Sequence, residues 1–405
     1  MNLKAEVITI KTLIEIFDMC QVENAIAGLK FNPERIVYVG FKNVMSNKKT
    51  TALKDFLENK GVTSEIIFEK IEDYEYSLVV EKLNSIIETY PDCYIDLTGG
   101  KDIVLTAAGA VSNARNVPMF QFNVRSEKFI NVFGCEDVLN TKTSFMTINE
   151  AMELNGCLVL DNEKEDVKWD FNDDFKKDIS KMWDILKVHC GSWNKQANTF
   201  ELLEKKGKVE NGITSDEEIY IDQRIIESLK KAGLIYDYEK REKYITFKYK
   251  NSQIRKCLTK AGNILELYCY LILREIKEEN SGYYDDVDQS IYIDWDGIVH
   301  SDKDPKYKDT KNEVDIMVTR DLIPIFISCK NGEVHKEALY ELDTISKKFG
   351  GKYGKKYLLA TYLSSDKESV KYLKQRAKDM NITLIDNLNT KTRKEIKDKF
   401  IKSIK

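Results

Sequence analysis

The stretch NEVDIMVTRDLIPIFISCKNG, residues 312–332, decides the fold of the C-terminal part of this chain. Two β-rich runs, EVDIMVT and PIFISCK, flank a four-residue turn, so the stretch predicts a β-hairpin. Side chains alternate between the two faces of a strand, which puts Glu313 and Asp315 on one face of the first strand and Ser328 and Lys330 on one face of the second. Two acids and a lysine are therefore expected to meet at one place on a buried hairpin.

Carboxylates beside a lysine at a buried position allow two interpretations. Carboxylate oxygens suit a divalent metal ion, and a neighbouring lysine can position or deprotonate an attacking water. The alternative is a buried Asp–Lys ion pair with a purely structural role, because charged groups in a protein interior have to be paired. The residue pattern alone leaves both open.

The spacing of these residues favours the first interpretation. Asp315, twelve residues and then Ser328-x-Lys330 resemble the Asp…(Asp/Glu)-x-Lys signature of restriction-endonuclease-like nucleases. Ser328 departs from that signature, which usually has an acid there, so one metal ligand must come from elsewhere. The segment LTKAGNILELYCYLILREIKEEN, residues 258–280, predicts a buried helix with Glu266 on a mostly apolar face. Many nucleases of this fold carry a helical Glu before the hairpin, which matches Glu266; the alternative is a capped or solvated Glu near a helix start.

Composition places the chain in a broad class. Its 405 residues predict two or three domains, and 42% hydrophobic with 32% charged residues are typical of a soluble globular protein. A net charge of −4 means that any nucleic-acid surface must be local. Eight cysteines without a CxxC pair and three scattered histidines predict reduced thiols and no zinc finger. No apolar run approaches the roughly 18 residues of a membrane span, and the start MNLKAEVITIK lacks a signal-peptide pattern, so we expect a cytoplasmic protein.

Residues 1–150 alternate short apolar runs with helical patterns, which predicts a parallel, doubly wound α/β sheet. Ligands bind such sheets at the carboxyl ends of the strands. The turn 98–101, TGGK, lies between a buried strand and a helix, where paired glycines let backbone N–H groups approach a phosphate and where Thr98 and Lys101 add donors. The turn is neither a P-loop nor a GxGxxG fingerprint. It indicates a nucleotide or another phosphate-bearing ligand, with the alternative that Gly-Gly merely ends the strand.

The middle and C-terminal regions have different patterns. Helical patterns at 174–190, 197–206 and 216–232 precede a charged hairpin over 234–249, an order typical of a winged helix, which either binds DNA or couples domains. The C-terminal region continues after the central hairpin with a helix over 336–349, a strand over 356–363, a helix over 366–379, a strand over 382–387 and a basic amphipathic tail.

Several segments occur in an order that resembles a known family. They are TLIEIFD, ENAIAGLKFNPERIVYVG, YIDLTGG, LTKAGNILELYCY, NEVD, PIFISCKNGEV and ELDTISKKFGGKYGKKYLLAT. Together they resemble the CRISPR-associated ancillary nucleases that join an N-terminal CARF domain, a Rossmann-like doubly wound sheet, to a C-terminal restriction-endonuclease-like PD-(D/E)xK domain. The resemblance spans almost the whole chain and is weakest between about residues 155 and 250. It implies a CARF domain over 1–150, a helical, winged-helix-like connector over 151–254 and a nuclease domain over 255–405.

The resemblance also implies a ligand and a partner. Members of this family act as homodimers whose CARF domains bind a cyclic oligoadenylate made by a type III CRISPR complex, usually cyclic tetra-adenylate, and so take part in antiviral defence. Carried over to this sequence, the ligand-binding residues are Thr98, Gly99, Gly100 and Lys101 in the turn, with Asp18, Asn24, Phe41, Lys42 and Asn43 as neighbours.

For catalysis, the resemblance implies metal-dependent cleavage of single-stranded or nicked DNA and of RNA, with Mn²⁺ preferred and Mg²⁺ as the alternative. The corresponding catalytic residues are Glu266, Asp315 and Lys330, with Ser328 at the usual acid position. Glu266 and Asp315 are the expected metal ligands, and Glu313 and the backbone carbonyl of Cys329 are further candidates. Two other functions stay open: a ligand-responsive DNA-binding regulator without cleavage, and a metal nuclease that needs no nucleotide.

Overall fold

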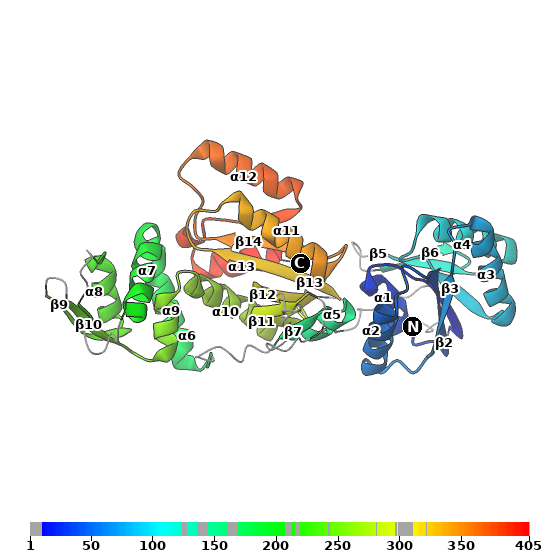
Figure 1. Ribbon diagram of the computed structural model, residues 1–405, viewed down its shortest axis with the longest axis horizontal. Helices are drawn as coiled ribbons and strands as arrows, with labels where there is room; N and C mark the ends of the chain where they lie inside the picture. Colours follow the sequence, from blue (N-terminus) through cyan, green and yellow to red (C-terminus); the bar gives the residue numbers. More distant parts are fainter. Residues whose placement is uncertain are drawn as a thin grey trace, which may run out of the picture.

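A six-stranded sheet forms the N-terminal part of the computed structural model, drawn in blue and cyan in Figure 1. The strand order is β3-β2-β1-β4-β5-β6, and all neighbours are parallel except β5 and β6. Its strands are β1 (Thr12–Ile16), β2 (Arg35–Phe41), β3 (Glu65–Ile71), β4 (Cys93–Asp96), β5 (Met119–Asn123) and β6 (Lys128–Phe133). The structure describes residues 10–123, 128–135, 145–160, 169–206, 213–214, 219–241, 244–280, 282–295, 298, 311–320 and 322–404.

Helices cover both faces of this sheet. The helices are α1 (Gln21–Phe31), α2 (Asn47–Asn59), α3 (Tyr76–Thr89) and α4 (Asp102–Arg115). Helices α1 and α2 pack together, as do α3 and α4, and the two pairs lie on opposite sides of the strands (Figure 1). The predicted doubly wound α/β fold is therefore confirmed. Because the strand order reverses between β1 and β4, the carboxyl ends of these two strands form the topological switch point, where such sheets bind ligands.

A second six-stranded sheet forms the C-terminal part, with the order β15-β14-β13-β12-β11-β7. Its strands are β7 (Leu158–Leu160), β11 (Asp286–Asp294), β12 (Lys311–Arg320), β13 (Ile323–Lys330), β14 (Lys355–Ala360) and β15 (Ile382–Ile385). Strands β12 and β13 are antiparallel, so the predicted central hairpin is present, while β13, β14 and β15 are parallel. The helices of this part are α5 (Ile148–Leu154), α10 (Asn263–Glu279), α11 (Lys336–Gly350), α12 (Lys367–Asp379) and α13 (Arg393–Ser403).

One element differs from the sequence-based expectation. The helix predicted over 258–280 corresponds to α10, which begins later, at Asn263; residues 258–259 end a separate helix, α9 (Ser252–Thr259), and residues 260–262 lie between the two. The backbone of Lys260 is extended, which stops the first helix, and Gly262 is the N-cap of the second. The break moves Glu266 from the middle of a long helix to the first turn of α10.

The middle segment lies at the end of the molecule opposite the N-terminal sheet (Figure 1). It contains α6 (Asp173–Val188), α7 (Cys190–Lys206), α8 (Gln223–Lys231) and a small sheet of β8 (Ile213–Thr214), β9 (Ile235–Arg241) and β10 (Tyr244–Tyr249). The predicted segment 151–254 also includes β7, which pairs with β11 of the C-terminal sheet. The chain therefore enters the C-terminal sheet first, leaves it to form the middle segment and then returns at α10.

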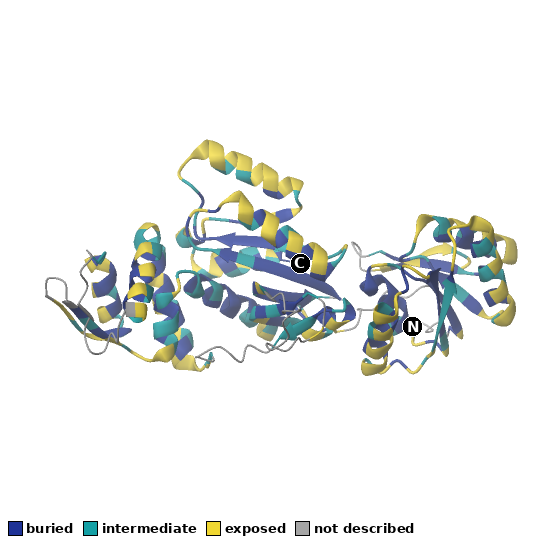
Figure 2. Cartoon of the chain, in the orientation of Figure 1, coloured by how far each residue is buried: buried dark blue, intermediate teal, exposed yellow. Residues whose placement is uncertain are grey.

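The N-terminal and C-terminal parts of the chain contact each other through helices α2 and α5. Lys60 at the end of α2 forms an ion pair of 2.7 Å with Glu150 of α5. The apolar side chains of both sheets join into one continuous cluster, while the middle helices share a second cluster with the other face of the C-terminal sheet. Figure 2 shows the inner strands of both large sheets as mostly buried and most of α12 as exposed. None of the described helices is long and apolar enough to cross a membrane.

Candidate catalytic and ligand sites

The central hairpin opens at the end that carries the predicted catalytic residues. The last paired residues of the β12–β13 ladder at that end are Ile316 and Ile327. Beyond this pair, Asp315 Oδ2 accepts a hydrogen bond of 2.6 Å from the backbone N–H of Cys329 and one of 3.2 Å from the hydroxyl of Ser328. The Asp315 side chain thus replaces the backbone pairing and is fixed between the two strands.

Four of the predicted side chains line one small cavity at this opening. Glu313, Asp315, Ser328 and Lys330 face a space of about 30 Å³, enough for about one water molecule. Glu341 of α11 lines the same cavity and was not predicted from the sequence. The sequence indicates only that this helix directly follows the strand of Lys330. The structure shows that α11 packs on that strand.

Glu266 reaches the same group of charges from α10. Burial is the main cause that raises the pKa of Glu266, to about 8, and the negative charges of Asp315 and Glu313 raise it further. Burial also raises the pKa of Asp315, although Lys330, the Cys329 N–H and Ser328 act against this. The Lys330 ammonium lines the same cavity as Asp315, and its charge lowers the pKa of both carboxyls. The structure therefore brings Glu266, Asp315 and Lys330 together, as the sequence predicted.

This group of carboxylates has the chemistry of a Mg²⁺ or Mn²⁺ site. Within the described part of the chain, no three His, Cys, Asp or Glu side chains are arranged to hold a metal ion by themselves. Mg²⁺ is usually held by one or two carboxylates together with waters and substrate phosphates, which Glu266 and Asp315 can satisfy. Burial raises the pKa of both carboxyls, and a bound cation would favour their charged forms. Glu313 is exposed at the mouth of the site, and the thiol of Cys329 is buried.

A pair of asparagines connects this site to the middle segment. Asn194 of α7 donates from Nδ2 to the backbone carbonyl of Asn331 at 2.6 Å, and Asn331 donates from Nδ2 to Asn194 Oδ1 at 2.7 Å. Asn331 also donates to the carbonyl of Ala261 at 3.3 Å. Asn331 follows Lys330, and Ala261 precedes the helix of Glu266. The three residues therefore tie the strand of Lys330 to the start of the helix of Glu266.

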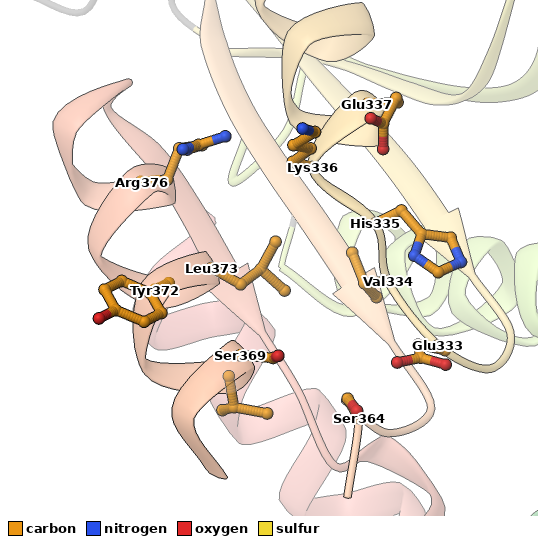
Figure 3. A pocket seen from close by; sticks show the side chains of 11 residues that line it. Glu333, Val334, His335, Lys336, Glu337, Ser364, Ser369, Tyr372, Leu373 and Arg376 are labelled. Carbon is orange, nitrogen blue, oxygen red and sulfur yellow. The ribbon is translucent and has the colours of Figure 1, made fainter. Parts of the chain in front are cut away.

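A larger groove lies beside the candidate catalytic cavity. It has a volume of about 450 Å³ and runs between α12 and the start of α11, with Tyr372 and Arg376 on one wall and His335, Lys336 and Glu337 on the other (Figure 3). Glu337 is one helical turn before Glu341, so α11 contributes to both the groove and the cavity. The groove is lined by two basic side chains, Lys336 and Arg376, by two acidic ones, Glu333 and Glu337, and by the exposed ring of Tyr372.

The predicted ligand turn lies at the switch point of the N-terminal sheet. Asp18, after β1, accepts hydrogen bonds from the backbone N–H groups of Cys20 at 2.7 Å and Gly100 at 2.9 Å. Burial alone would raise the pKa of Asp18, but these two N–H groups hold it below its ordinary value. Asn24 is buried and exchanges two hydrogen bonds with the Asp18 backbone. The hydrogen bonds of Asp18 and Asn24 thus hold the loop after β1 in place and connect it to Gly100 of the ligand turn.

Gly100 is required by its backbone and by its surroundings. Its φ angle is +118°, and a Cβ atom there would lie 2.2 Å from Cγ2 of Ile16. Thr98 is 6% exposed: its hydroxyl donates to Asp96 at 2.5 Å and accepts from the Phe122 N–H at 2.8 Å. The side chain of Thr98 is therefore used inside the fold, while Lys101 is exposed at the start of α4.

Three other predicted ligand residues lie at the end of β2 and directly after it, and they contact the segment after β3. Phe41 is 1% exposed and stacks on Tyr74 with 3.8 Å between ring centroids. Lys42 forms an exposed ion pair with Glu72, and Asn43 accepts a hydrogen bond from the Tyr74 hydroxyl. The strand β2, which precedes Lys42 and Asn43, is next to β1 in the sheet.

A pair of buried acids under the ligand turn was not predicted. Glu15 on β1 is opposite Asp96 on β4, and both are fully or almost fully buried. Burial raises the pKa of Asp96 to about 7 and that of Glu15 well above its ordinary range, where the neighbouring Asp96 adds to the effect. The two carboxyls therefore hold at least one proton near neutral pH. The available sequence signal was a Glu inside the apolar run TLIEIF.

Comparisons with known proteins bear on the fold. The sequence matches no protein-family model and no curated protein. Among solved structures, protein VC1899 from Vibrio cholerae is similar with a TM-score of 0.73 and 14% identity, over 96% of this chain and 97% of that one. Can2 from Sulfobacillus thermosulfidooxidans, solved in complex with cyclic tetra-adenylate, is similar with a TM-score of 0.70 and 17% identity, over 98% of this chain and 97% of that one.

A third structure, a type III CRISPR defence DNA nuclease activated by cyclic oligoadenylate, aligns less well, with a TM-score of 0.45 and 46% of that chain covered. The comparison of folds therefore rests on the first two proteins. The fold that the resemblance implied is confirmed: from its N-terminal doubly wound sheet to its C-terminal mixed sheet, this chain has the fold of Can2.

Proposed function

We propose that this chain is a metal-dependent nuclease, activated by cyclic tetra-adenylate, that cleaves single-stranded or nicked DNA and RNA in type III CRISPR antiviral defence. The observation that carries the proposal is the convergence of Glu266, Asp315 and Lys330 from three different elements. Glu266 and Asp315 are half-buried carboxyls with raised pKa values beside a lysine, which supports a charged partner that binds there. A DNA-binding regulator would not need this group.

In the proposed reaction, Glu266 and Asp315 hold Mn²⁺ or Mg²⁺, which when bound offsets negative charge at the scissile phosphate. The Lys330 ammonium donates a hydrogen bond to the attacking water or to a phosphate oxygen, and it is placed for this by its position at the end of β13. Ser328 holds Asp315 Oδ2 by a hydrogen bond of 3.2 Å and so orients the carboxylate. Glu313 and the Cys329 carbonyl remain further candidates for metal ligands.

Support for the ligand comes from the switch point of the N-terminal sheet. Can2 holds cyclic tetra-adenylate within the same fold. In this chain, the exposed Lys101 at the start of α4, next to the glycine turn, suits a phosphodiester. Because a cyclic tetra-adenylate ring is symmetric, we propose that two copies of the chain bind it as a homodimer in the cytoplasm. Measuring the molar mass in solution with and without the ring tests the dimer.

One experiment separates this proposal from its alternatives. Purified protein is incubated with Mn²⁺ and labelled single-stranded DNA, RNA or plasmid, with and without cyclic tetra-adenylate. We expect cleavage only with the ring, and none in Asp315→Asn or Lys330→Met, while both variants still bind the ring. Cleavage without the ring would favour a nucleotide-independent nuclease. Binding of a specific DNA sequence without any cleavage would favour the regulator.

A further inference from the structure

The loop between α11 and β14 reaches out of the C-terminal sheet to the ligand turn of the N-terminal sheet. Lys352 donates from Nζ to Glu23 Oε1 at 2.9 Å, and the hydroxyl of Tyr353 donates to the same oxygen. Glu23 is in the first turn of α1, directly after the Asp18 loop. Gly351 brings the loop so close that a Cβ atom there would lie 3.5 Å from the sulfur of Cys20. A contact across more than 300 residues of sequence therefore adjoins the predicted ligand site.

One carboxylate oxygen of Glu23, on the side that faces the ligand turn, has no hydrogen-bond partner. The residue is 1% exposed, and its second carboxylate oxygen, Oε2, is buried without a hydrogen-bond partner. A Cβ atom on Gly99 would lie 3.1 Å from this oxygen, so Oε2 is directed at the glycine turn. A buried unpaired carboxylate oxygen is costly. A ligand donor, such as a nucleobase amino group or a ribose hydroxyl, would satisfy it.

Lys352 supplies positive charge at the same place. Its side chain is 63% exposed, whereas the Glu23 side chain is 0% exposed, so the ammonium covers the carboxylate from the solvent side. An ammonium group has three donors, so one bond to Glu23 leaves others for a phosphate. Lys49, which interacts electrostatically with Asp18, and Lys101 lie around the same turn. Positive side chains from α2, from the start of α4 and from the C-terminal loop therefore surround the buried acids.

The loop is also connected to the candidate catalytic site. It begins at the end of α11, which carries Glu341, and it leads into β14, which pairs with β13 so that Ala360 is opposite Lys330. Gly350 packs on β13, because a Cβ atom there would come within 2.6 Å of the ring of Phe326. A displacement of this loop would therefore move elements that line the catalytic cavity.

We propose that Lys352 of the C-terminal domain is part of the anion-binding site of the N-terminal domain, where it bridges Glu23 and a phosphodiester of the bound ligand. The C-terminal domain then contacts the ligand directly, with Glu23 Oε2 accepting a donor of the same ligand. This inference deepens the proposed function and rests on it, since the ligand considered is a cyclic oligonucleotide. It adds a ligand contact outside the N-terminal sheet.

Titration calorimetry with cyclic tetra-adenylate on the full-length chain, without divalent metal, tests the inference. Lys352→Met should weaken binding about tenfold to a hundredfold, the effect of losing one hydrogen bond to a charged group. Lys352→Arg, which keeps the charge, should restore most of the affinity. Lys347→Met is the matched control, because it removes the same charge from a side chain that is 71% exposed and pairs with Asp343 inside α11.

The outcomes separate the inference from the proposed function. If the wild-type chain does not bind the ring, the proposed function fails. If the wild-type chain binds it and Lys352→Met binds as tightly as Lys347→Met, the function stands and the inference is wrong. If Lys352→Met is weaker but Lys352→Arg is equally weak despite an unchanged melting temperature, the charge is not the cause and the inference is also wrong.

Discussion

Replacement of Asn194 by alanine should slow cleavage although this residue lies in the middle segment. The substitution removes the two hydrogen bonds of 2.6 and 2.7 Å that hold the Asn331 turn next to Lys330. Each neutral hydrogen bond contributes about 1 kcal/mol, so about 2 kcal/mol is lost. If all of it positions Lys330 in the transition state, the rate falls about 30-fold. The 3.3 Å bond from Asn331 to Ala261 remains, so the expected decrease is about 5- to 30-fold.

Single-turnover cleavage at saturating ligand and metal measures this effect. The affinity for cyclic tetra-adenylate should stay unchanged, because Asn194 is far from the N-terminal sheet. Asn194→Asp keeps the acceptor for Asn331 but loses the donor, and should be intermediate. Lys205→Ala on the same helix removes only an exposed ion pair with Glu201 and should cleave at the wild-type rate. A wild-type rate in Asn194→Ala would refute the positioning role.

Two further predictions concern the groove and the buried acids. Arg376→Ala should raise KM for single-stranded DNA severalfold and leave ligand affinity unchanged, because the guanidinium lines the groove beside the catalytic cavity. Steady-state kinetics with single-stranded DNA and with RNA measures this effect, and an unchanged KM would contradict the prediction. Asp96 has a folded pKa of about 7 against an ordinary 3.8, so the unfolded chain binds fewer protons between these values and stability falls as pH rises from about 4 to 7. Asp96→Asn should flatten this fall in melting temperature between pH 5 and 8; an equal slope in both proteins would contradict the assignment.

Local periodicity predicted most of the elements because each is one continuous run of sequence. The alternating apolar pattern of EVDIMVT and PIFISCK predicted the hairpin, and the strands of the N-terminal sheet are short apolar runs separated by helical patterns. The start of α10 was predicted five residues too early because the polar stretch TKAGN, residues 259–263, was included in the helix, whereas the extended backbone of Lys260 separates α10 from α9. Strand β7 was missed because three residues carry too little periodicity.

The site could be predicted only where its residues share one segment or match a known spacing. Asp315, Ser328 and Lys330 lie within one hairpin, and Glu266 fitted the order of elements in a nuclease family. Asn194 instead reaches the site from an element far away in the chain, and Glu341 reaches it because α11 packs on β13, and neither is encoded in the sequence as a local pattern.

The candidate catalytic hairpin is held from both sides by parts of the chain outside its own sheet. On one side, Asn194 of the middle segment fixes the turn after Lys330. On the other side, the loop of Lys352 joins the helix of Glu341 to the ligand turn of the N-terminal sheet. A ligand that changes the position of this loop would therefore act on α11, which lines the cavity. Such an arrangement can couple ligand binding to catalysis through a small displacement, and linkage requires that occupancy of the catalytic site affect ligand affinity to the same extent.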